Sequence, residues 1–172
     1  MKKDPNTINL LGDHYFHGLY GLQKDLRKGA ELWTEATELG SVKALFSLGV
    51  AYGNGEGVEQ DEAKSIHYYK EAAMQGHVES RHYLGNYEGK NGNHDNAVRH
   101  FLISAKMGYI DSIETIKRMF MAGIATKEQY AQALKLYQEA VEEMKSHDRD
   151  EVKRLGYLPT RESWPKRGEE SS

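Results

Sequence analysis

Residues 48–58 read LGVAYGNGEGV, and residues 61–73 read DEAKSIHYYKEAA. The first stretch predicts a helix that ends in a glycine-rich loop, and the second predicts another helix that begins after Asp61, because aspartate is preferred at a helix N-cap. One face of the second helix carries small and apolar side chains three and four residues apart: Ser65, Ile66, Tyr69, Ala72 and Ala73. A helix with a single apolar face needs a neighbouring helix against which to bury it.

The same two-helix pattern recurs along the chain. A large aromatic residue occupies the position of Tyr69 in each unit, at spacings of 36, 32 and 36 residues: Trp33, Tyr69, Phe101 and Tyr137. In the first three units a glycine follows seven residues later, at Gly40, Gly76 and Gly108. Glycine readily adopts the left-handed conformation that ends many helices. The sequence therefore predicts four helix-turn-helix units of about 36 residues, and repeats of this length are typical of solenoids.

The stretches 48–58 and 61–73 closely resemble the Sel1-like repeat, a relative of the tetratricopeptide repeat, and the resemblance covers roughly residues 6–145. It implies an all-α, right-handed α-solenoid. The domain is expected to span residues 1–150, and residues 151–172 are expected to form a flexible tail. The repeats are expected at residues 6–40, 41–76, 77–108 and 109–147. The fourth lacks the Leu-Gly pair of the others and has Ile116 and Lys117 there, as expected of an end unit.

The composition narrows the classes of function. Proline is absent between Pro5 and Pro159, which favours helix throughout. A net charge of −3 does not favour nucleic acid as a partner, because such binders usually concentrate Lys and Arg on one face. The sequence contains no apolar run long enough to span a bilayer, so we expect no membrane insertion. The absence of cysteine and of a signal sequence fits a cytoplasmic location.

No catalytic, cofactor or metal site is expected. The pair His14 and His17 is spaced to share one helix face, but a zinc site needs three or four protein ligands. The sequence contains no cysteine, no His-Glu-x-x-His motif, no Ser-x-x-Lys motif and no phosphate-binding glycine loop. We therefore expect that the chain is not an enzyme and takes no metal and no cofactor.

A protein or peptide partner is the expected ligand, bound on the first helices of the repeats. On the first helix of repeat two, Ala44 and Leu48 face the core by helical-wheel arithmetic, and the opposite side is free. In tetratricopeptide relatives the equivalent side lines the concave groove. Carried over by resemblance, the candidate binding residues are Asn9, Asp13, Lys43, Phe46, Val50, Glu79, His82, Asn86, Glu114 and Arg118.

Phe46 and Arg118 are the expected anchors of that groove, because aromatic residues and arginine are enriched at interface hot spots. The wheel predicts that replacing both would abolish binding with little effect on stability. A second function stays open at this point: the chain could be a structural segment of a longer solenoid that spaces other domains.

Overall fold

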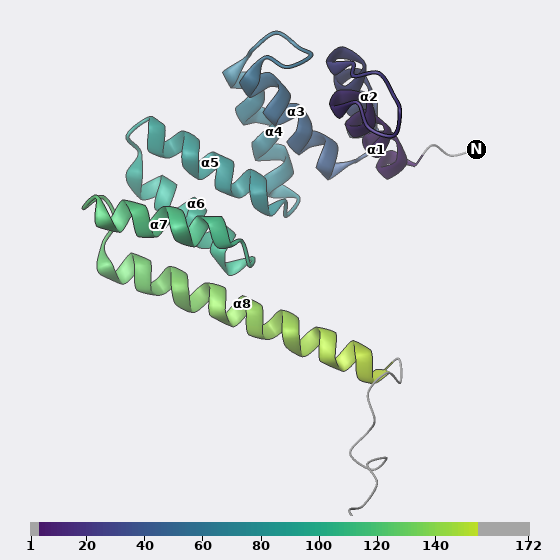
Figure 1. The fold of residues 1–172 in the computed structure, drawn as a ribbon. Helices are drawn as coiled ribbons and strands as arrows, with labels where there is room; N and C mark the ends of the chain where they lie inside the picture. Colours follow the sequence, from purple (N-terminus) through teal and green to yellow (C-terminus); the bar gives the residue numbers. More distant parts are fainter. Residues whose placement is uncertain (1–3, 155–172) are drawn as a thin grey trace, which may run out of the picture.

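The computed structural model describes residues 4–154, which fold into eight α-helices and contain no strand (Figure 1). The helices follow one another as four antiparallel pairs, one pair for each predicted repeat. Their bounds are α1 (Pro5–His17), α2 (Leu26–Glu38), α3 (Val42–Asn54), α4 (Glu62–Met74), α5 (Val78–Lys90), α6 (His94–Lys106), α7 (Ile110–Met121) and α8 (Lys127–Arg154). We call α1, α3, α5 and α7 the A helices and the other four the B helices.

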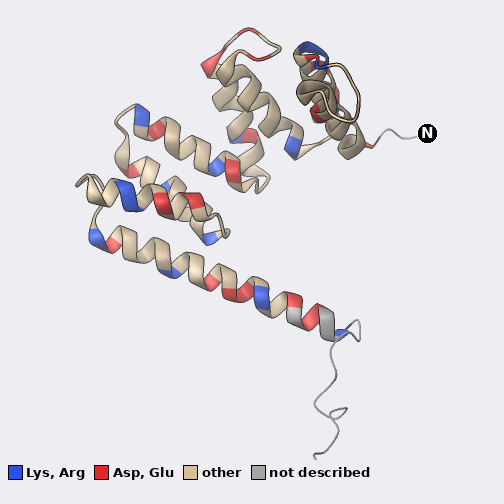
Figure 2. Cartoon of the chain, viewed as in Figure 1, with Lys and Arg blue, Asp and Glu red and all other residues tan. Residues whose placement is uncertain are grey.

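Basic and acidic side chains are interspersed over the eight helices, and the view in Figure 2 shows no single basic face. None of the helices between residues 4 and 154 combines the length and the apolar character that crossing a lipid bilayer requires.

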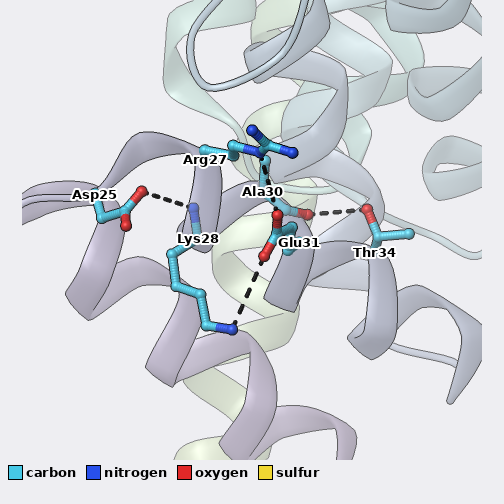
Figure 3. Close-up of polar contacts among 6 residues, drawn as sticks. All are labelled: Asp25, Arg27, Lys28, Ala30, Glu31 and Thr34. Carbon is cyan, nitrogen blue, oxygen red and sulfur yellow. Dashed lines mark hydrogen bonds and ion pairs between the residues drawn. The ribbon is translucent and has the colours of Figure 1, made fainter.

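Polar side chains fix the starts of the helices. The Asp25 carboxylate accepts a hydrogen bond of 2.9 Å from the backbone amide of Lys28 (Figure 3), and Asp61 does the same for Lys64 at 3.0 Å. The N-cap predicted at Asp61 is thus confirmed, and Asp25 plays the same part at the start of α2. The last helix begins with a reciprocal pair, in which the Thr126 hydroxyl accepts from the amide of Gln129 and the Gln129 side chain accepts from the amide of Thr126.

Glycines end the first three repeats in the left-handed region, as predicted. The φ angles are 93° at Gly40, 86° at Gly76 and 88° at Gly108. A side chain with a Cβ rarely adopts this conformation, so these three positions favour glycine.

The recurring Leu-Gly pair and the recurring aromatic residue turn out to be partners. A Cβ built on Gly49 would lie 2.6 Å from Cε1 of Tyr69, and one built on Gly85 would lie 2.7 Å from Cε1 of Phe101. Trp33 lies against Gly12 in the same way, at 2.7 Å. Within each of these repeats the aromatic ring of the B helix occupies the space that a side chain on the A helix would need. The motif therefore encodes the close crossing of the two helices.

Three apolar clusters run along the solenoid. One joins α1, α2 and α3 around Phe16, Trp33 and Leu48, and another joins α6, α7 and α8 around Phe101 and Ile116. The smaller cluster between them contains Tyr69 and Leu84. Each B helix of the first three repeats packs against the A helix that follows it, so the core continues from repeat to repeat.

The fourth repeat departs from the pattern. Its second helix, α8, packs against α6 as well as against α7. Lys117 stands where the other A helices carry glycine, and α7 packs less extensively against α8 than the earlier A helices pack against their own B helices. The helix α8 continues to Arg154, so residues 151–154 are helical, and the end of the domain at residue 150 stays a prediction. The remainder of the predicted tail lies outside the described residues.

Candidate partner-binding face

The predicted binding residues lie on the A helices with very different exposures. Lys43, Glu114 and Arg118 are exposed, whereas Asp13, Phe46, Val50, Glu79 and Asn86 are half-buried. Asn9 and His82 are buried, at 6% and 8% exposure. We call the surface formed by these ten residues the A-helix face.

Charged groups link the A-helix face across the first two repeat junctions. Burial raises the pKa of Asp13 on α1, and the positive charge of Lys43 on α3 acts in the opposite direction. The same Lys43 acts on His77, the residue that caps α5, whose pKa is lowered mainly by burial. One lysine therefore lies within electrostatic reach of groups on the repeats before and after its own.

A second set of charges continues the face to the fourth repeat. Burial lowers the pKa of His82 on α5, and Asp111 and Arg118 on α7 act on it with opposite signs. The pKa of Tyr109 is raised to about 12 by burial, by a hydrogen bond with Asp111 and by the negative charges of Asp111 and Glu79. The A-helix face is thus electrostatically connected over all four repeats.

Asn9 and His82 were expected on an open surface, and the structure corrects this. The Asn9 amide donates a hydrogen bond of 3.3 Å to the Asp13 carboxylate, which also accepts one of 2.9 Å from the Trp33 indole. His82 is hydrogen-bonded to Ser112 on the next A helix, with 2.9 Å between Nδ1 and Oγ. His82 thus joins α5 to α7, whereas Asn9 is bonded within α1, and both buried side chains offer little surface to a partner.

Phe46 also has a structural role that the sequence did not reveal. Its ring lies 4.7 Å from His77, 5.5 Å from Tyr83 and 5.9 Å from Tyr69, measured between ring centroids. The ring therefore packs between repeats two and three, and its removal would leave a gap in this aromatic cluster. The expectation that Phe46→Ala leaves stability unchanged is wrong, because the ring is half-buried against α4 and α5.

A cleft between α4 and α5 was missed by the sequence reasoning, which selected only Asn86 among its residues. The cleft has a volume of about 680 Å³, and we call it the tyrosine cleft. Its walls include Glu62, Tyr69, Tyr83, Asn86, Tyr87 and Lys90. One signal was present in the sequence, since Tyr83 and Tyr87, like Asn86 and Lys90, are four residues apart and share one side of a helix.

His77, Ser80 and Glu79 superficially resemble a hydrolytic triad. His77 Nδ1 lies 3.0 Å from Ser80 Oγ, and Nε2 lies 3.6 Å from a Glu79 carboxylate oxygen. However, Ser80 has no exposed surface, so its hydroxyl cannot meet a substrate. The amide of Ser80 donates to His77 Nδ1, and the arrangement is the N-cap of α5. No group of three metal-binding side chains occurs between residues 4 and 154.

We expect the stability of the domain to fall as the pH drops below about 6.5, the ordinary pKa of histidine. The pKa values of His77, His82 and His100 are all lowered in the folded state, chiefly by burial. Below pH 6.5 these histidines therefore bind protons more readily in the unfolded chain than in the folded chain. The stability present above pH 6.5 is lost as the pH falls toward the lowered pKa values of the folded state. Urea unfolding at about pH 7.5 and pH 5.5 measures the loss.

The variant His77→Ser isolates one contribution to that loss. Ser41 caps α3 at the equivalent position of repeat two, where its hydroxyl accepts from the amide of Ala44. A serine at position 77 keeps a capping oxygen and removes the titrating ring, so this variant should lose less stability between the two pH values than the wild type. An identical loss in both proteins would show that His77 does not titrate with folding.

Comparison with known proteins finds four repeats of one family in this chain. The family model described as Sel1 repeat matches residues 5–41, 42–77, 78–109 and 118–143. The fourth matched stretch is the shortest, in agreement with the missing Leu-Gly pair of the last repeat.

Among the proteins similar to this chain are one curated relative and two solved structures. Chitin synthase regulatory factor 3 of Schizosaccharomyces pombe is 32% identical over 76 residues, which are 44% of this chain and 8% of that protein. A protective antigen of uropathogenic Escherichia coli strains, described as displaying an SLR fold, superimposes with a TM-score of 0.68 at 30% identity over 81% of this chain and 31% of the other. A Sel1 repeat protein from Oxalobacter formigenes superimposes with a TM-score of 0.64 at 26% identity, over 81% of this chain and 58% of the other.

Proposed function

This chain belongs to the Sel1 repeat family, and we propose that it is a non-enzymatic adaptor that binds a peptide or a helix of another protein along its A-helix face. Repeats of this family typically mediate protein–protein interactions. The similar protein from Schizosaccharomyces pombe is named as a regulatory factor, although the matched region is only 8% of its length.

The observation that carries this proposal is the exposure of charged side chains on different A helices, with Lys43 on α3 and Glu114 and Arg118 on α7. Lys43 acts on groups of repeats one and three, while Arg118 and Asp111 of repeat four act on His82 of repeat three. A stacked array of repeats presents such a surface to an extended ligand. Exposed charges of both signs along one face also suit a partner of defined charge pattern, because electrostatic complementarity selects partners and fixes their register.

The proposal assigns binding to the exposed members of the face. Lys43 and Arg118 are exposed and lie on different repeats, α3 and α7. Phe46 now counts as a support of this surface and not as its anchor, since its ring packs against His77 and Tyr83.

We expect the double variant Lys43→Glu with Arg118→Glu to weaken capture of the main cellular partner by about tenfold to a hundredfold, which corresponds to roughly 1.4 to 2.7 kcal/mol. The partner is first identified by affinity capture from native lysate with mass spectrometry, and its affinity is then measured with purified proteins. Circular dichroism and thermal melting verify that the variant is folded.

A matched control carries Arg27→Glu and Lys135→Glu on the B helices α2 and α8. The side chains of these two residues are 85% and 77% exposed, and each lies next to a glutamate one turn away, as Figure 3 shows for Arg27 and Glu31. This control changes the net charge by the same amount and should bind the partner as the wild type does. Full binding by the folded A-helix variant would place the contact elsewhere on the chain.

The end repeats favour a second candidate function, that of a structural segment in a longer solenoid. Apolar side chains are exposed on the first and last repeats, among them Leu10 at 53% on α1 and Met144 at 49% on α8. In a longer array such side chains would be covered by neighbouring repeats. In that case the capture experiment should return no partner that depends on Lys43 or Arg118.

A further inference from the structure

The tyrosine cleft presents aromatic rings from two helices to an open space. Tyr83 and Tyr87 lie one turn apart on α5, and Tyr69 comes from α4. The rings of Tyr69 and Tyr83 are 5.1 Å apart and tilted by 35°. Tyr83 is 40% exposed, so part of its ring is available to a ligand although the ring also packs on Phe46.

Hydrogen-bonding groups without partners lie beside these rings. Within residues 4–154 the side-chain amide of Asn86 makes no hydrogen bond to protein, and neither do the hydroxyls of Tyr83 and Tyr87. An amide NH₂ and two phenolic hydroxyls provide donors for the carbonyl groups of a ligand.

The charged side chains that line the tyrosine cleft sum to zero net charge. Glu62 at the start of α4 and Lys90 at the end of α5 line it with opposite signs, and neither forms an ion pair in the described part of the chain. The lining therefore matches a ligand segment without net charge. A phosphorylated segment is disfavoured, because its recognition typically needs a cluster of arginines.

The remaining ways of binding a peptide fit the cleft less well. Addition of a strand requires an open sheet edge, and residues 4–154 contain no strand. An amphipathic helix requires a continuous apolar groove, whereas amide, hydroxyl and charged groups interrupt these walls. A polyproline II segment has no internal hydrogen bonds and exposes its carbonyls, and it docks on aromatic-lined grooves.

We propose that the tyrosine cleft binds an uncharged, proline-rich segment in the polyproline II conformation. The prolines lie against the rings of Tyr83 and Tyr87, which the buried ring of Tyr69 supports from behind, and Asn86 donates to a carbonyl of the ligand. This inference deepens the proposed adaptor function and rests on it, because the ring of Phe46 joins the cleft to the A-helix face. The cleft then recognises one short segment of the partner.

The test uses a fluorescein-labelled, uncharged synthetic decapeptide rich in proline, amidated at its C-terminus, and the same peptide with glycine in place of every proline. Fluorescence anisotropy on the full chain should show at least tenfold tighter binding of the proline peptide. Asn86→Ala and Tyr87→Ala should each weaken that binding at least tenfold. The control Asn96→Ala, an exposed position on α6, should change it less than twofold.

Specific outcomes would overturn the inference. These are equal affinity for the two peptides, tighter binding of the glycine peptide than of the proline peptide, or unchanged affinity in both cleft variants. If Asn86→Ala or Tyr87→Ala unfolds, Tyr87→Phe removes only the hydroxyl. In addition, backbone amide shifts of the wild type should then localise the peptide to α4 and α5.

The double variant Lys43→Glu with Arg118→Glu should bind the proline peptide as tightly as the wild type does, although its affinity for the cellular partner falls. The proposed function and the further inference can therefore be contradicted independently of each other.

Discussion

Replacing Trp33 with alanine is expected to lower the free energy of unfolding by about 4 to 6 kcal/mol. Trp33 is 3% exposed, its ring packs 4.6 Å from that of Phe16, and it fills the space beside Gly12. Truncation of a buried tryptophan costs about 3 to 5 kcal/mol. The half-buried carboxylate of Asp13 would also lose the hydrogen bond of the indole, which adds about 1 kcal/mol or more.

Urea and thermal unfolding measure this effect, and two further variants separate its causes. Trp33→Phe keeps an aromatic ring but removes the N–H donor, so it should lie between wild type and Trp33→Ala and should raise the pKa of Asp13 further. Thr34→Ala changes the neighbouring exposed residue, whose hydroxyl donates to the carbonyl of Ala30 (Figure 3), and should stay within about 0.5 kcal/mol of wild type. A similar loss in Thr34→Ala would show that Trp33 does not hold the first repeat together.

Gly49→Val is expected to destabilise the domain by about 3 kcal/mol, because overpacking typically costs about 1 to 3 kcal/mol and sometimes more. The new Cβ alone would lie 2.6 Å from the ring of Tyr69. That ring cannot move away easily, since Phe46 and Tyr83 contact it. For a domain of this size the melting temperature should drop by roughly 6 to 12 °C.

Lys43→Ala, on the exposed side of the same helix, is the control and should change stability by less than about 0.5 kcal/mol. The smaller variant Gly49→Ala should fall between the two, because it adds the clashing Cβ and no further methyl groups. Equal denaturation midpoints for Gly49→Val and Lys43→Ala would contradict the close crossing of α3 and α4.

The repeat architecture could be predicted from sequence because it depends on local rules. Caps such as Asp25 and Asp61 act within three residues, and glycines such as Gly40 act on their own backbone. The contact between Gly49 and the Tyr69 ring recurs in the first three repeats, at Gly12 with Trp33 and at Gly85 with Phe101. Each occurrence in the sequence therefore supports the assignment of the other repeats. The amino-acid sequence by itself thus determined the number of repeats, the ends of most helices and the family to which the chain belongs.

The surface of the A helices was decided only by the tertiary structure. A helical wheel describes one helix and its own B helix, and it carries no information on the next repeat. The rings of Phe46 and His82 contact aromatic residues of their own B helices, Tyr69 and Phe101, as well as the neighbouring repeat. In the structure Phe46 packs on the rings of His77 and Tyr83, and His82 is hydrogen-bonded to Ser112 of the next repeat. Asn9 is hydrogen-bonded to Asp13 of its own helix, which also accepts from Trp33 on α2. The tyrosine cleft arises in the same way, since α4 and α5 belong to different repeats. Contacts between repeats depend on how the units stack, and that stacking is fixed by packing over the whole domain.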